Sequence, residues 1–179
     1  NGFITYMRTD STPLSDEAVE GSRHIVSDLF GDDFLPKSPN NYETNVKNAQ
    51  EAHEAIRPAH KIFKSIDTVS KKLGKDAGNL YDLIWKRTIA SQMLPAKLKQ
   101  TSVIISNADT DFRASGQTIV FPGYMKIYVE GKDNPEAELA NKEKILPEMS
   151  ENEMLMCNQI SSQSHQTKPP ARFTEASLV

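Results

Sequence analysis

The stretch GFITYMRTDST, residues 2–12, carries two side chains that could act together on an anion, Tyr6 and Arg8. Side chains two residues apart share a face of a β-strand, with Cα atoms about 6 to 7 Å apart, so both could reach one phosphate-sized group. Tyrosine is also an ordinary strand-forming residue, and an arginine beside an aromatic ring commonly packs along it. Taken alone, these eleven residues favour packing over catalysis for Tyr6.

A second tract, NAQEAHEAIRPAH at residues 48–60, brings a histidine close to an arginine. His53-Glu54 begins like the zinc motif H-E-x-x-H, but the second histidine position holds Arg57 and Pro58 would end the helix, which excludes that site. If the tract is helical, His53 and Arg57 share a face and could grip a phosphate. Glu54 and Arg57 could equally form a plain surface ion pair.

Composition limits the classes of protein that remain. The 179 residues carry a formal net charge of −3, which argues against a broadly basic surface and leaves only local contact with DNA. The single cysteine, Cys157, excludes an internal disulfide framework and fits a reducing compartment. Without a membrane-length apolar run or a signal peptide, we expect a cytoplasmic protein with no membrane partner. Asn1 lies inside a strand-like segment, so we expect an excised fragment.

Helical signals dominate the first half of the chain, and strand signals follow them. The pattern from Ser15, a candidate N-cap, to Gly31 predicts an amphipathic helix. Further helices are predicted over residues 66–73 and about 77–94, the last ended by Pro95. Short β-prone runs follow at residues 99–106, 111–115, 117–121, 124–129 and 153–160, with turns expected at Ser115-Gly116 and Pro122-Gly123. We therefore expect an α+β chain with antiparallel strands from about residue 96.

Four tracts resemble, in this order, segments of the type IA DNA topoisomerases: GFITYMRTDS, QEAHEAIRP, LYDLIWKRTIASQMLPAK and TKPPARFTEASLV. The resemblance spans nearly the whole chain, and Met7 with the E-A-I-R-P run favours the bacterial topoisomerase I branch. It implies a helical domain carrying the nucleophilic tyrosine at residues 1–95. It also implies an incomplete antiparallel β arch segment of a toroidal enzyme at 96–169 and the start of the next domain at 170–179.

The resemblance also implies a reaction. Tyr6 is similar to the family's nucleophile, which attacks a phosphodiester of single-stranded DNA and leaves a 5′-phosphotyrosine link and a free 3′-hydroxyl that later reseals the strand. Because a phenol is mostly protonated at neutral pH, a nearby cation is needed. Arg8 matches the family's phosphate-binding arginine, and His53 matches a histidine near the scissile phosphate. Arg57 is expected to be structural or to bind the DNA backbone, and Thr9, Asp10 and Ser11 to turn and cap the chain.

The same resemblance implies Mg²⁺ in the full-length enzyme, bound by acidic residues of a toprim-type domain that nothing here matches. The full enzyme would relax negatively supercoiled DNA without ATP, with its other domains as partners. We expect this chain alone neither to bind Mg²⁺ tightly nor to relax DNA. A competing hypothesis is a non-catalytic module that binds single-stranded nucleic acid or another partner, with Tyr6 packed.

Overall fold

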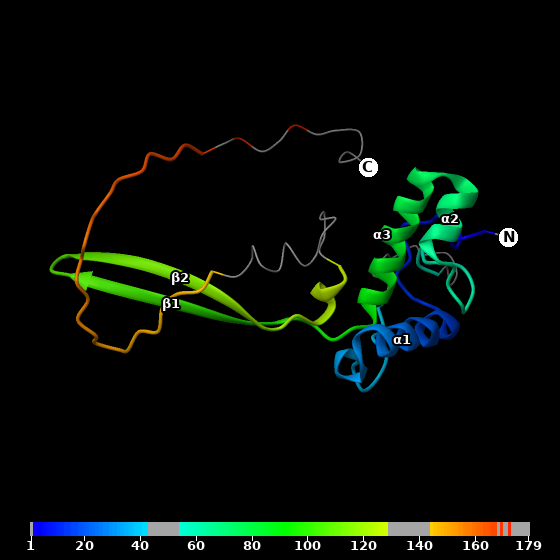
Figure 1. The fold of residues 1–179 in the computed structure, drawn as a ribbon, viewed down its shortest axis with the longest axis horizontal. Coiled ribbons are helices and arrows are strands. Elements are labelled where there is room, and N and C mark those ends of the chain that lie inside the picture. Colours follow the sequence, from blue (N-terminus) through cyan, green and yellow to red (C-terminus); the bar gives the residue numbers. More distant parts are fainter. Residues whose placement is uncertain (1, 43–53, 129–143, 168, 170–171, 173–179) are drawn as a thin grey trace. The chain divides into compact units, whose positions relative to one another are not determined.

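The computed structural model describes residues 2–42, 54–128, 144–167, 169 and 172. The chain divides into two compact units, residues 1–146 and residues 147–179. All helices and strands of the described residues belong to the first unit (Figure 1). They are α1 (Asp16–Phe30), the 3-10 helix η1 (Asp32–Phe34), α2 (Ile66–Leu73), α3 (Lys75–Ser91), β1 (Lys97–Asn107), β2 (Thr110–Phe121) and the 3-10 helix η2 (Gly123–Lys126). Three α-helices and a two-stranded antiparallel sheet confirm the α+β class.

The first two α-helices form over the residues where the sequence predicted them, and a serine caps each one. The Ser15 side chain accepts a hydrogen bond from the Ala18 amide at the start of α1, and Gly31 ends the helix with a φ of 91°. In α2 the Ser65 side chain accepts from the Thr68 amide in the same way. Each cap satisfies an amide that the helix itself leaves without a partner, so these boundaries follow from local chemistry.

Helix α3 ends at Ser91, three residues before the predicted end, because a tertiary contact replaces its last turn. The buried Gln92 side chain donates to the Asn40 carbonyl and accepts from the Asn40 amide. The Asn40 side chain in turn donates to the carbonyls of Ser91 and Met93. The loop after η1 thus supplies the partners that another helical turn would have provided.

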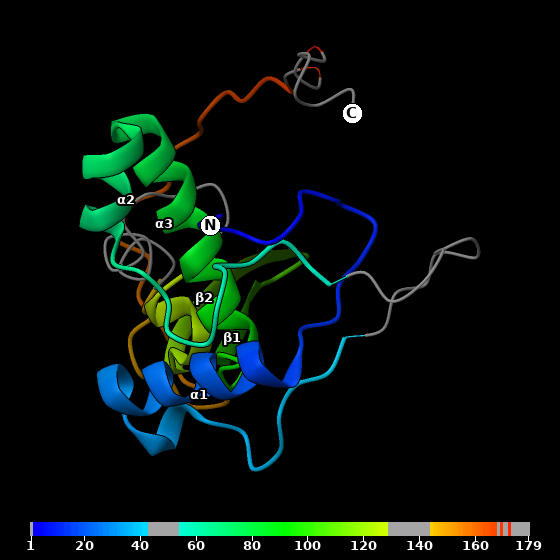
Figure 2. The ribbon, with the colours of Figure 1, turned by 90° about the vertical axis from the view of Figure 1, so that its right-hand side faces the viewer.

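The hydrophobic core lies where α1 crosses the C-terminal end of α3 (Figures 1 and 2). Its buried members come from both helices and from the segment after η2: Val26, Ile89, Ala90, Met93 and Ile127. Gly123, with a φ of 51°, makes this closure possible, since a Cβ there would lie 2.4 Å from the Leu94 carbonyl oxygen. The Tyr124 amide donates to that same oxygen. The turn expected at Pro122-Gly123 therefore returns the chain to the helical core.

Strands β1 and β2 form one hairpin, paired from Asn107 with Thr110 to Lys97 with Phe121. The turn expected at Ser115-Gly116 is wrong, because both residues lie inside β2. Gly116 serves a close backbone approach instead. A Cβ at this position would lie 2.5 Å from the Lys144 carbonyl oxygen, and Lys144 pairs with Gln117 beside it.

Two other expected strands are also wrong. Most of the run at 124–128 forms η2 and the core contact of Ile127, because the turn at Gly123 directs it onto α3 rather than along the sheet. In the second unit, residues 153–160 form no strand, and the Met154 side chain is 94% exposed. A β-prone run needs a neighbouring strand to pair with, and the described residues of this unit offer none. Among the described residues, no helix combines the length and apolarity that a membrane crossing requires.

Candidate active site

The segment carrying Tyr6 is paired with the segment carrying Arg57. Ile4 and Pro58 form an antiparallel bridge. The Thr5 amide donates to the Arg57 carbonyl at 2.9 Å, and the Ala59 amide donates to the Phe3 carbonyl at 2.8 Å. The extended pairing stops at Thr5, because the chain turns after it and the Arg8 amide donates to the Tyr6 carbonyl at 2.9 Å. The strand expected to give Tyr6 and Arg8 a common face is therefore not formed at those residues.

Thr5 fixes the position immediately before the tyrosine. Its hydroxyl donates to the Ala55 carbonyl at 2.8 Å and accepts from the Arg57 amide at 3.0 Å. Its own amide is used as well, so this one residue makes three hydrogen bonds across the segment pair. The backbone that presents Tyr6 is thus held from one side by residues about fifty positions away.

Tyr6 is the most exposed tyrosine of the five in the chain, and all five are described. Its exposed fraction is 79%, against 45% for Tyr42 and 39% for Tyr124, while Tyr128 is partly buried. Tyr81 shows the packed alternative, since it is 2% exposed, its hydroxyl donates to the Lys64 carbonyl, and burial raises its pKa. The packing interpretation of Tyr6, favoured by its local sequence, is wrong.

Arg8 is held by a carboxylate two residues away. Its Nε lies 2.8 Å from both oxygens of Asp10, and both side chains are about one-third exposed. Asp10 therefore orients Arg8, while the helix cap that this motif was expected to provide comes from Ser15. The guanidinium is fixed close to Tyr6 in the chain, and its catalytic and DNA-binding roles stay predictions.

The second tract is only partly described, and His53 lies outside the described residues. Residues 54–57 are not helical, so the helix face on which His53 and Arg57 were expected to meet does not form in that part of the tract. The role predicted for His53 is untouched by this observation.

Arg57 is buried, with 6% of its surface exposed, and its guanidinium is saturated. Nε and Nη2 donate to the two oxygens of Glu54, Nη2 also donates to the Ser15 hydroxyl, and Nη1 donates to the carbonyls of Pro58 and His60. A guanidinium has five N–H donors, and these bonds use all five. No donor remains for a phosphate, so of the two roles expected for Arg57 the geometry supports the structural one.

Glu54 completes this network and ties it to α1. Its Oε1 accepts from the Ser15 amide at 2.8 Å, one residue before the helix begins. Burial by itself would raise the pKa of the Glu54 carboxyl. Hydrogen bonds from Arg57 and Ser15, with the positive charge of Arg57, outweigh that effect and hold the pKa below its ordinary value. Glu54, Arg57 and Ser15, here called the clamp, connect the start of α1 to the segment that holds Thr5.

The described residues do not form a metal site of the kind that the resemblance assigns to the full enzyme. None of their His, Cys, Asp and Glu side chains gather in a group of three or more that could hold an ion.

The sequence matches the family described as "DNA topoisomerase" over residues 1–179. It is 52% identical to DNA topoisomerase 1 of Streptomyces coelicolor, over 100% of this chain and 19% of that protein, and 49% identical to the Synechocystis enzyme of the same name, over 99% and 20%. Full-length topoisomerase I from Thermotoga maritima matches with a TM-score of 0.61 and 32% identity, over 82% of this chain and 21% of that one. The chain belongs to the DNA topoisomerase family.

This topoisomerase chain spans about a fifth of the length of the relatives it matches. The resemblance read from four short tracts is confirmed by identity along the whole chain. The clamp was not predicted from the sequence. The Glu54–Arg57 ion pair was foreseen only as a surface contact, and nothing in one sequence indicates that Ser15, 42 positions away, joins it.

Replacing Arg57 with alanine should destabilise this topoisomerase chain by about 2–4 kcal/mol, because a partly buried Glu54 carboxylate would lose its partner and α1 its anchor. Urea unfolding followed by circular dichroism measures the change. Lys86→Ala is the matched control, since it breaks a more exposed ion pair with Asp82, whose side chains are 30% and 29% exposed, and should cost less than about 1 kcal/mol. Equal losses in the two variants would contradict a structural role for Arg57.

The clamp should also make stability depend on pH in a defined direction. The pKa of Glu54 is lower in the folded chain than its ordinary value of 4.5, so its contribution is complete above that pH and is lost as the pH falls through the folded value. The stability difference between the unmodified chain and Glu54→Gln should therefore shrink below about pH 4.5. Unfolding curves between pH 7 and pH 3 measure it, and a difference that grows on acidification would refute the assignment.

Proposed function

We propose that this chain supplies the nucleophile of a DNA topoisomerase that cuts and rejoins one DNA strand. In the proposed step, the Tyr6 phenolic oxygen attacks a backbone phosphorus and the bond from phosphorus to the 3′-oxygen breaks. The phenol loses its proton and the 3′-oxygen gains one. One phosphodiester replaces another, so the reverse attack by the 3′-hydroxyl reseals the strand without an external energy source.

The observation that carries this proposal is the exposure of Tyr6 on a held backbone. An attacking group must be accessible to a strand arriving from solution, and at 79% exposure Tyr6 is the most accessible of the five phenols. It must also be positioned, because catalysis gains from reacting groups held in place. Thr5 and the clamp supply that positioning through hydrogen bonds that involve neither the phenol nor its ring.

The same exposure weighs against the competing hypothesis of a non-catalytic module, which requires Tyr6 to be packed. Arg8 is proposed to stabilise the charge that develops on the attacked phosphate, since its guanidinium lies two residues from Tyr6 and is oriented by Asp10. His53 is proposed to contact the same phosphate. The substrate is proposed to be single-stranded DNA at the cleavage point, and relaxation of negative supercoils the outcome.

Mg²⁺ is proposed to act only in the full-length enzyme, where it would supply positive charge near the phosphates. The described residues do not fit such an ion, so the step written above uses none. The isolated chain is therefore proposed to be inert towards supercoiled DNA.

The test of Tyr6 uses a chimera in which these 179 residues replace the matching segment of the Streptomyces coelicolor enzyme, to which they are 52% identical. With a 5′-labelled or 3′-labelled single-stranded oligonucleotide, the chimera should give a denaturation-resistant adduct that carries the 3′ label only. Tyr6→Phe should abolish the adduct, because phenylalanine has no oxygen with which to attack.

The matched control is Tyr124→Phe, which removes the hydroxyl of another exposed tyrosine, 39% exposed, and should leave the adduct intact. An adduct that survives Tyr6→Phe, or one that carries the 5′ label, would disprove the proposed step.

Arg8→Ala in the same chimera should slow adduct formation by about 10²-fold, as expected when one preorganised donor to a developing charge is removed. Arg8→Lys keeps the charge but loses the planar fork, and should recover part of the rate. Single-turnover formation of the adduct measures both rates. An Arg8→Ala rate equal to that of the unmodified chimera would remove Arg8 from the site.

A further inference from the structure

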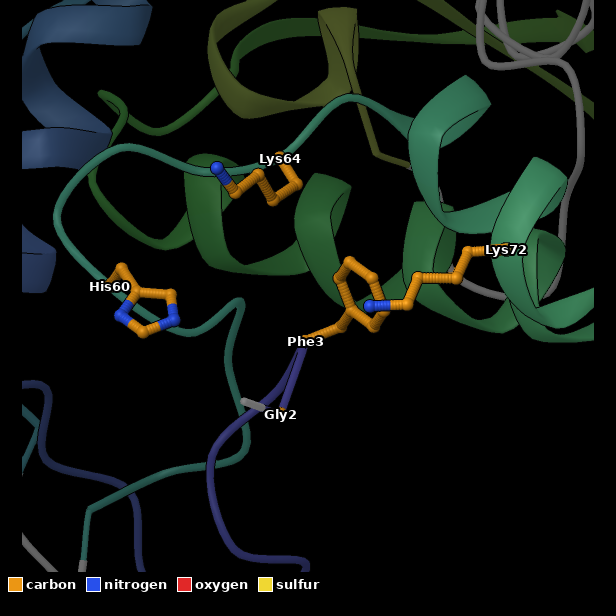
Figure 3. A pocket seen from close by; sticks show the side chains of 5 residues that line it. All are labelled: Gly2, Phe3, His60, Lys64 and Lys72. Carbon is orange, nitrogen blue, oxygen red and sulfur yellow. The ribbon is translucent and has the colours of Figure 1, made fainter.

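A cavity of about 360 Å³ lies beside the first residues of the chain, separate from the Tyr6 side chain. Figure 3 shows its lining, which comes from the N-terminal segment, from the segment before α2 and from α2 itself. The lining residues are Gly2, Phe3, His60, Lys64 and Lys72. Two lysines and a histidine thus line this cavity together with an aromatic ring, and among the described residues no acidic side chain lines it.

Lys64 and Lys72 both line the cavity, and neither has a carboxylate partner among the described residues. Lys72 extends from α2 over the Phe3 ring, with Nζ 5.3 Å from the ring centroid (Figure 3). An aromatic face attracts an ammonium group but does not neutralise its charge, so Lys72 is positioned while it stays able to bind an anion. Lys61, close by in the chain, contrasts with these two because it is paired with Glu20.

His60 is held in the cavity wall by an unusual backbone. Its φ of 68° lies in the left-handed region, which non-glycine residues rarely adopt because it is strained for a side chain with a Cβ. Two hydrogen bonds hold this conformation. Arg57 of the clamp donates to the His60 carbonyl, and the amide of the adjacent Ala59 donates to the Phe3 carbonyl. The exposed imidazole can donate a ring N–H to a phosphate oxygen even when it is neutral.

We propose that this cavity is a phosphate subsite, which holds a backbone phosphate of the DNA strand a few nucleotides from the one at Tyr6. Lys64 and Lys72 bind the phosphate oxygens, and His60 donates to one of them. Phe3 and Tyr6 are three residues apart on one hydrogen-bonded segment, so their Cα atoms are at most about 11 Å apart, a distance that a few nucleotides span. The choice of DNA as the source of the phosphate rests on the proposed function.

The test measures binding of a fluorescent single-stranded oligonucleotide of mixed sequence to the 179-residue chain by anisotropy, over a range of salt concentrations. Each phosphate contact to a single strand releases counterions with a salt exponent of about 0.7, equivalent to about fivefold in affinity at 0.1 M salt. Lys64→Ala and Lys72→Ala should each weaken binding by about fivefold and lower the salt slope by about 0.7. Lys71→Ala is the matched control, because Lys71 adjoins Lys72 in α2 and does not line the cavity.

Equal effects of Lys71→Ala and Lys72→Ala would overturn the proposal, since they would show diffuse charge and no subsite. Absence of oligonucleotide binding by the folded, unmodified chain would overturn it as well. A mononucleotide and inorganic phosphate are tested as separate ligands. Binding of either that depends on Lys72, without binding of the oligonucleotide, would show a site for a free phosphate compound and overturn the assignment to a strand.

The Tyr6→Phe variant distinguishes failure of the proposed tyrosine chemistry from failure of the phosphate subsite. In the Tyr6→Phe chain, Lys64→Ala and Lys72→Ala should still each weaken oligonucleotide binding by about fivefold, because the subsite does not use the phenol. Binding that depends on Lys64 and Lys72 in a chain whose chimera forms no Tyr6 adduct would support the subsite while the tyrosine chemistry fails. Loss of the dependence on Lys64 and Lys72 in the Tyr6→Phe chain would overturn the subsite as a separate contact.

Discussion

The buried Arg57 guanidinium is the interaction on which the arrangement of the N-terminal half depends. One planar group satisfies both oxygens of Glu54, the hydroxyl of the α1 cap and two backbone carbonyls. A lysine at this position would offer three donors from a single point and could not span these partners. The clamp therefore joins the start of α1 to the strand partner of Thr5, and it holds the left-handed turn at His60.

In this arrangement the residues that hold the Tyr6 backbone in place are different from the side chain that is exposed to solvent. Tyr6 makes little packing contact, as its exposure shows, and its position is set by Thr5 on one side and the Arg8–Asp10 pair on the other. A tyrosine buried in the core would have to leave it to act as the proposed nucleophile on a strand. Positioning through neighbouring backbone leaves the phenol accessible, at the cost of a buried charged network that must be fully paired.

Glycines in the second half of the first unit mark close approaches of separate segments. Gly123 lets η2 pass against the end of α3, and Gly116 lets the Lys144 carbonyl approach β2. Both are glycines for steric reasons, yet in the sequence they look alike, each beside a turn-prone residue. Only Gly123 lies in a turn, whereas Gly116 lies inside β2. The distinction depends on which segment arrives from elsewhere, and one sequence does not contain that information.

The sequence by itself determined the helix boundaries set by Ser15 and Gly31, because caps act over three or four residues. It also determined the family, through tracts that match in order. Tertiary structure decided the rest. It ended α3 through Asn40, diverted a β-prone run into the core, buried Arg57 and left Tyr6 exposed. Each of these outcomes rests on contacts between residues tens of positions apart, where burial and hydrogen-bond saturation outweigh local preference.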